Sequence, residues 1–161
     1  MIFITVGTDI YQFDRFLKMV DNALAELSLS EEVLFQTGNS SYVPTHGRSV
    51  KFLPYQEMKS CMQKAAVIIT HGGVGTVDMA LSMGKKPIVC PRQQSLNEVI
   101  DNHQLLYSRC VEKHGYVFLV QNEAELKQAI PLALDPQTSS VSIQVSQERD
   151  NLIKFLDSLV V

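Results

Sequence analysis

The sequence has few cysteines and no long apolar run, and each shortage excludes a class of protein. Its three cysteines, Cys61, Cys90 and Cys110, are odd in number, widely spaced and free of any C-x-x-C pair. This pattern argues against a disulfide framework and against a zinc site, and it is typical of a reducing compartment. No apolar run reaches the roughly 18 residues that a membrane-spanning helix needs. The opening MIFITVGTD predicts a strand followed by a turn, so we expect no export signal and a cytoplasmic location.

An excess of positive charge is also missing. Fourteen Lys and Arg residues stand against seventeen Asp and Glu residues, which gives a formal charge of -3. The basic residues form no cluster with interleaved aromatics, so nucleic acid is not expected as a partner. A chain of 161 residues is long enough for one domain with a true core. We therefore predict a single domain over residues 1–161.

Two nucleotide-binding fingerprints are absent from the sequence. The first turn reads TVGTDIYQFD, which is not G-x-G-x-x-G, and this disfavours a nicotinamide or flavin enzyme. The sequence contains no G-x-x-x-x-G-K-[ST] either, so a P-loop nucleotidase is excluded. Any phosphate site must therefore use a different glycine turn.

Alternating apolar patterns predict an α/β fold. Short apolar runs predict strands over residues 2–6, 33–36, 50–53, 66–70, 88–90 and 116–119. Three- and four-residue apolar steps predict helices over 11–27, 96–111 and 123–134, and another helix that ends at Gly84. Alternation of this kind predicts a Rossmann-like parallel sheet with helices on both faces, in three layers. A last helix over about 145–160 is also predicted, packed either on its own sheet or on a second protein.

The glycine-rich run HGGVGT directly follows a predicted strand and opens a predicted helix. A helix N-terminus offers unpaired N–H groups and partial positive charge, which favour phosphate. Gly72, Gly73 and Gly75 would provide backbone donors, Thr76 a hydroxyl, and His71 an imidazole donor. The alternative interpretation is a tight turn in which His71 is only a local cap.

A second polar cluster lies in PRQQSLNEVIDNHQ, which follows the predicted strand 88–90. A helix that starts near Leu96 would place Asn102, His103 and Gln104 about one and a half turns from its start. Their amide and imidazole groups can hydrogen-bond sugar hydroxyls, although they can also simply face water. Together with the glycine turn, the cluster indicates a phosphate and a sugar bound side by side.

These segments, together with the opening MIFITVGTD, resemble the C-terminal, donor-binding half of the GT-B glycosyltransferases of family 28. The resemblance extends from Met1 to about Leu134. It is strongest to short stand-alone versions of that half, namely the catalytic subunit of the dolichol-pathway N-acetylglucosaminyltransferase and bacterial exopolysaccharide or capsular glycosyltransferase subunits. It implies a hexosyltransferase that moves a sugar from a UDP-sugar to a lipid-pyrophosphate-linked saccharide, with inversion and without a metal or other cofactor.

The resemblance also implies roles for individual residues. Its donor-binding positions correspond to Gly7, Thr8, His71, Gly72, Gly73, Gly75, Thr76, Asn102, His103 and Gln104. His71 is the candidate catalytic residue, because stabilising a leaving pyrophosphate needs a fixed donor and the sequence contains no Asp-x-Asp motif to hold a metal. The family often has a glutamate for the ribose where this sequence has Met79, and the nearest acid is Asp78.

A complete GT-B enzyme has a second, acceptor-binding domain that this chain is expected to lack. The resemblance therefore implies a membrane-anchored acceptor-binding partner that recruits this chain to the cytoplasmic membrane face. The general base is not identified in the sequence, and that partner can supply it. A homodimer is at most secondary. Two alternatives are a non-catalytic UDP-sugar-binding subunit and a nucleotide-sugar epimerase or hydrolase. The epimerase or hydrolase would need acids and bases such as Glu98, Asp101 and His103.

Overall fold

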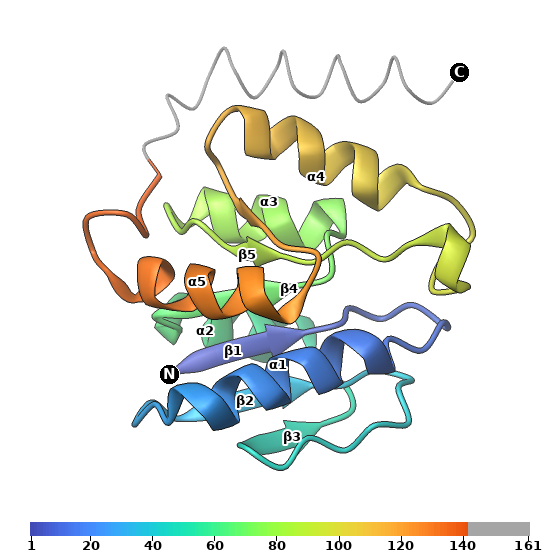
Figure 1. Ribbon diagram of the computed structural model, residues 1–161, viewed down its shortest axis with the longest axis horizontal. Coiled ribbons are helices and arrows are strands. Elements are labelled where there is room, and N and C mark those ends of the chain that lie inside the picture. The colour runs from blue at the N-terminus through green and yellow to red at the C-terminus, as the bar shows by residue number, and fades with distance from the viewer. Residues whose placement is uncertain (142–161) are drawn as a thin grey trace.

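Six parallel strands form one sheet in the computed structural model, which describes residues 1–141 (Figure 1). The strands are β1 (Ile2–Thr5), β2 (Val33–Gln36), β3 (Arg48–Val50), β4 (Val67–Thr70), β5 (Ile88–Val89) and β6 (Phe118–Leu119). Their order across the sheet is β3-β2-β1-β4-β5-β6. The parallel sheet predicted from the sequence is therefore confirmed, and the carboxyl ends of all six strands lie at one edge.

The two central strands explain why the sequence encodes a buried parallel sheet. Strands β1 and β4 pair in register from Ile2 opposite Val67 to Thr5 opposite Thr70. Every residue of both strands is buried. A strand covered on both faces must be apolar on both faces, which is why IFIT and VIIT read as continuous runs rather than alternating ones.

Helices cover both faces of the sheet, as predicted. They are α1 (Asp14–Leu27), α2 (Tyr55–Lys64), α3 (Val74–Ser82), α4 (His103–Lys113) and α5 (Glu123–Leu134). Helices α1 and α5 pack together against one face of the sheet. Helices α2 and α3 cover the other face, and α4 packs beside α3 on the β5 side. The result is the three-layer arrangement seen in Figure 1.

The predictions for three elements were wrong or incomplete. The strand predicted over 50–53 lies at Arg48–Val50, because an edge strand needs no apolar run and only Val50 of it is partly buried. Helix α2 was not predicted, since Met62 is its only fully buried residue. The helix predicted from Leu96 begins at His103. A short 3-10 turn, Gln94–Leu96, precedes it, and Asn97 adopts a left-handed conformation (φ 55°) that stops helix propagation.

The turn that ends α3 lies against the last described residues of the chain. Gly84, at φ +72°, follows α3 as the predicted helix-terminating glycine. The chain returns to this turn at its described end, where the Lys86 amide donates to the Ser139 carbonyl at 3.0 Å. The helix predicted over about 145–160 lies outside the described residues. Within residues 1–141, no helix combines the length and apolarity needed to cross a bilayer.

Candidate functional site

The loops that follow β1 and β4 meet the start of α2 at the carboxyl edge of the sheet. Together they line a cavity of about 500 Å³. Six of the residues predicted from the sequence border it, namely Gly7, Thr8, His71, Gly73, Gly75 and Thr76. Tyr55, Met58, Val74 and Met79 complete the lining. The two predicted glycine turns therefore form one site, at the edge where parallel sheets bind ligands.

The ring of His71 lies at the centre of the turn and leaves no room for a side chain at Gly7 or Gly73. Its imidazole is buried, with only 7% of the residue exposed. A Cβ atom at Gly7 would lie 2.5 Å from Cε1 of His71, and one at Gly73 would lie 2.4 Å from Nε2. Both distances are far below van der Waals contact. Gly7 and Gly73 are thus required by the packing of the His71 ring, a role that the sequence did not reveal.

The surroundings of His71 keep its ring neutral. Nδ1 lies 3.1 Å from the Thr70 hydroxyl. Burial, and after it the positive charge of Arg92, lower the pKa of His71 from 6.5 to about 4, against the opposing effects of the Thr5 backbone and the Asp9 charge. A neutral imidazole donates one hydrogen bond and accepts another. At neutral pH, His71 is therefore a weak base, and its Nε2–H tautomer would be able to donate to an anion.

The N-terminus of α3 opens beside His71. Gly73 is its N-cap residue, and no side chain within residues 1–141 caps this end of the helix. The amides of an uncapped first turn favour an anion. A Cβ atom at Gly75 would meet no other atom within 4 Å, so Gly75 borders open space. The arrangement can therefore receive a phosphate group between the first turn of α3 and His71.

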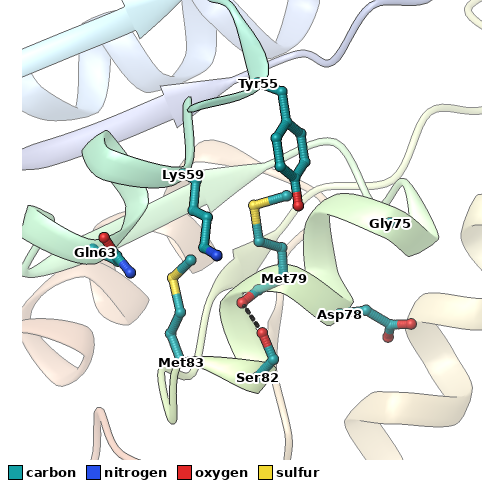
Figure 2. A pocket seen from close by; sticks show the side chains of 8 residues that line it. All are labelled: Tyr55, Lys59, Gln63, Gly75, Asp78, Met79, Ser82 and Met83. Atoms are coloured by element: carbon teal, nitrogen blue, oxygen red, sulfur yellow. Dashed lines mark hydrogen bonds between the residues drawn. The ribbon is translucent and has the colours of Figure 1, made fainter. Parts of the chain in front are cut away.

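A groove between α2 and α3 extends this cavity (Figure 2). It has a volume of about 480 Å³ and shares Tyr55, Gly75 and Met79 with the cavity. The side chains of Tyr55, Lys59 and Met79 point into it from the two helices in Figure 2. An aromatic ring and flexible thioethers next to a phosphate site can pack against a nucleoside.

Asp78, the acid nearest to the position of the missing glutamate, has a hydrogen-bond partner on α4. Asp78 is among the residues that line the groove, but in Figure 2 its carboxylate points away from Tyr55 and Lys59. The Tyr107 hydroxyl, from α4, donates to Asp78 Oδ1 at 2.7 Å. Met79 therefore presents a thioether where the resemblance implies a ribose-binding carboxylate.

The polar cluster after β5 lies at the start of α4 and not one and a half turns inside a helix. Asn102 is the N-cap residue, and His103 begins the helix. The Asn102 side chain accepts from the Gln94 amide at 3.3 Å, and the Gln104 side chain accepts from the Arg92 amide at 3.3 Å. None of the three predicted sugar-binding residues lines the cavity formed by residues 1–141. Their predicted contact with a donor sugar stays a prediction.

Gly72 likewise has a structural role. It adopts φ +82°, and a Cβ atom there would lie 2.8 Å from the Ser108 hydroxyl oxygen of α4. Gly72 thus allows the turn after β4 to approach α4 closely, and it does not line the cavity.

The structure removes one candidate acid of the epimerase or hydrolase alternative. Glu98 is buried, and its carboxylate is held by Arg15 at 2.7 and 2.9 Å and by the Gln93 amide at 3.0 Å. Asp101 and His103 form a 2.7 Å pair that is partly exposed and lies outside the cavity. Within residues 1–141, no three His, Cys, Asp or Glu side chains are grouped as metal ligands.

Sequence reasoning missed Tyr55 and Met58 of the cavity and the buried Arg92 beside it. Tyr55 and Met58 lie on the helix that was not predicted, which is why they were overlooked. The signal for Arg92 was its position in the segment that follows β5, but a single arginine there does not reveal its partners.

Comparisons with known proteins agree on one family. A model described as "Glycosyltransferase family 28 C-terminal domain" matches residues 1–153. The human protein named "UDP-N-acetylglucosamine transferase subunit ALG13" is 29% identical over 126 residues, which are 73% of this chain and 11% of that protein. The chain thus spans about a tenth of the length of the curated relatives that it matches.

Solved structures share the fold. The glycotransferase of kitacinnamycin superimposes with a TM-score of 0.64 and 19% identity, over 98% of this chain and 39% of that one. The solution structure of ALG13 superimposes with a TM-score of 0.61 and 16% identity, over 99% of this chain and 96% of that one. These two likenesses establish the fold and leave the reaction to the residues of the site.

Proposed function

Because the chain belongs to glycosyltransferase family 28, whose C-terminal domain it represents, we propose that it is the donor-binding subunit of a two-component hexosyltransferase that uses a UDP-sugar. The observation that carries this proposal is the cavity at the start of α3, where His71, Gly75 and Thr76 surround a position suited to a diphosphate. The adjoining groove between α2 and α3 provides room for a nucleoside (Figure 2).

The proposed reaction is transfer with inversion. An acceptor hydroxyl oxygen forms a bond to the anomeric carbon, the bond from that carbon to the UDP oxygen breaks, and UDP leaves with the electron pair. Negative charge then grows on the diphosphate and must be stabilised where water is excluded. The first-turn amides of α3 and a hydrogen bond from neutral His71 would supply this stabilisation without a metal.

The acceptor hydroxyl must also lose its proton to a base. His71 is a weak base at neutral pH because its pKa is about 4. Glu98 is held by Arg15, and Asp101 and His103 lie outside the cavity. We therefore assign the base to a partner subunit that binds the acceptor, a lipid-pyrophosphate-linked saccharide in capsule or exopolysaccharide biosynthesis.

Exposed apolar side chains support a partner at this edge. Several of the large hydrophobic residues that remain exposed lie on loops or first turns after strands, namely Ile10, Phe52, Tyr55, Val74, Leu96 and Ile100. Two of them, Tyr55 and Val74, line the cavity itself, and exposed apolar groups at the edge of a candidate site are typical of a surface that another protein covers. A partner with a membrane anchor would place this subunit at the cytoplasmic membrane face. The human relative is named a transferase subunit, which agrees with such an assembly.

A transfer assay with radiolabelled UDP-sugar tests this proposal. We expect label to enter the lipid fraction when the chain is mixed with membranes of its source organism, and to stay in the aqueous fraction when either is omitted. A His71→Ala variant is the matched negative control. Transfer to the lipid acceptor at full rate by the chain alone would refute the two-component arrangement.

A further inference from the structure

Arg92 is a fully buried cation that lies three residues after the end of β5. Only 1% of the residue is exposed. None of the ion pairs within residues 1–141 includes it. Burying a guanidinium without a carboxylate in direct contact is unfavourable, because its hydration is lost without a matching opposite charge. Other contacts must therefore offset the free energy that is lost when Arg92 is buried.

Backbone carbonyls from two loops hold the guanidinium in place. Nη2 donates to the Val6 carbonyl at 3.0 Å, and Nη1 donates to the carbonyls of Tyr11 and Gln12 at 3.0 and 3.2 Å. Nη1 also donates to the Glu98 carbonyl at 3.0 Å. Three of these four acceptors flank the turn that carries Gly7 and Thr8, and the fourth belongs to the segment between β5 and α4. Arg92 thus ties one wall of the cavity to the neighbouring loop.

An aromatic ring supports the same arrangement. The guanidinium carbon lies 4.6 Å from the centroid of the Phe13 ring, which in turn stacks on Phe16 of α1. A planar cation over a ring face is held in orientation as well as in position. Lysine would keep the charge but would lose the planar fork of donors.

Arg92 also acts on His71 through its charge. Its positive charge helps to lower the pKa of His71, after the larger effect of burial, whereas Asp9 acts in the opposite direction. The cation therefore favours the neutral imidazole that would donate to a diphosphate. Arg15, the other arginine of this region, pairs with Glu98 and is 30% exposed at its side chain.

We propose that Arg92 is a positioning residue for donor binding, which fixes the loop of Gly7 and Thr8 against the β5–α4 segment and places a buried positive charge behind His71. The inference deepens the proposed function and depends on it, because the loop that Arg92 holds is the wall of the proposed donor site. Arg92 itself does not line the cavity.

The test compares Arg92→Met, Arg92→Lys and the matched control Arg48→Met in the full chain. UDP affinity is measured by calorimetry, the His71 pKa by NMR titration, and amide exchange is followed at Gly7 and Thr8. For Arg92→Met we expect about a tenfold loss of UDP affinity, faster exchange at both amides, and a His71 pKa that rises above about 4 but stays below 6.5, because the burial that lowers it most remains. Arg92→Lys should keep the low pKa and still lose affinity. Arg48→Met, which removes an exposed arginine of edge strand β3 that pairs with Glu32, should leave affinity and the His71 pKa within error of the wild type.

The outcomes separate this inference from the function that it builds on. Failure of the wild-type chain to bind UDP would overturn the proposed function. Wild-type binding together with unchanged affinity, exchange and His71 pKa in Arg92→Met would overturn the role of Arg92. If Arg92→Met does not fold, Arg92→Lys decides the question, because unchanged affinity and exchange in that variant would equally overturn the inference.

Discussion

Replacement of Gly75 by alanine should change the stability of the fold and the affinity for UDP in opposite directions. Gly75 lies in the first turn of α3, and a Cβ atom there would have no neighbour within 4 Å. Alanine is more favourable than glycine inside a helix by roughly 0.5–1 kcal/mol. We therefore expect Gly75→Ala to be more stable than the wild type, with a melting temperature higher by up to about 2–4 °C.

The same methyl group should weaken donor binding. Gly75 lines both the cavity and the groove, so the added methyl would enter the space proposed for the diphosphate. A tenfold loss of UDP affinity, about 1.4 kcal/mol, is the expected size of the effect. The assay pairs thermal denaturation with calorimetric titration of UDP on the same preparation.

Gly73→Ala provides the contrast. Its Cβ atom would lie 2.4 Å from Nε2 of His71, so the ring or the turn must move. This variant should lose both stability and UDP affinity. UDP binding by Gly75→Ala at the wild-type affinity would refute the reasoning, since it would mean that the diphosphate does not lie against the first turn of α3.

Three further predictions concern individual side chains. The pKa of His71 is lowered to about 4 in the folded chain, so the unfolded chain binds more protons between pH 6.5 and pH 4. The free energy of unfolding should therefore fall by up to about 3 kcal/mol as the pH falls through that window. In His71→Asn, chemical denaturation at several pH values should show a weaker dependence of the free energy of unfolding on pH. Tyr107→Phe removes the donor to Asp78, which should cost about 1 kcal/mol in urea denaturation without changing UDP affinity. Met79→Glu places a carboxylate in the groove, and competition titrations should show tighter binding of UDP but not of 2′-deoxy-UDP.

The central strands and the glycine turn could be predicted because burial on both faces leaves a plain mark on the sequence. Because IFIT and VIIT are continuous apolar runs separated by helical patterns, they are typical of strands in a sheet that is covered on both faces. Helix α2 leaves almost no such mark, since Met62 is the only fully buried side chain in it. The position of edge strand β3 was mispredicted for the same reason, because none of its three residues is fully buried.

The roles of the glycines were predicted only in part, because they depend on contacts between distant segments. Gly7 was expected to serve donor binding and Gly73 a phosphate, yet both are needed by the ring of His71. Gly72 makes room for Ser108, and only Gly75 of this set borders open space. A sequence shows that a glycine is present, but the atom that excludes a Cβ there appears only in three dimensions.

Arg92 shows a different limit of the sequence. Its partners are four backbone carbonyls, and any residue type supplies a carbonyl. No pattern of side chains could therefore identify the network. The segment that contains it was singled out for Asn102, His103 and Gln104, whose polar character was plain in the sequence.

The most direct test of the account is a calorimetric titration of the chain with UDP, once with magnesium and once with a chelator, beside His71→Ala. The account predicts binding of equal strength in both buffers and at least about tenfold weaker binding by the variant, because His71 and the first turn of α3 are proposed to hold the diphosphate without a metal. Binding that requires magnesium, or that is unaffected by the loss of His71, would contradict it.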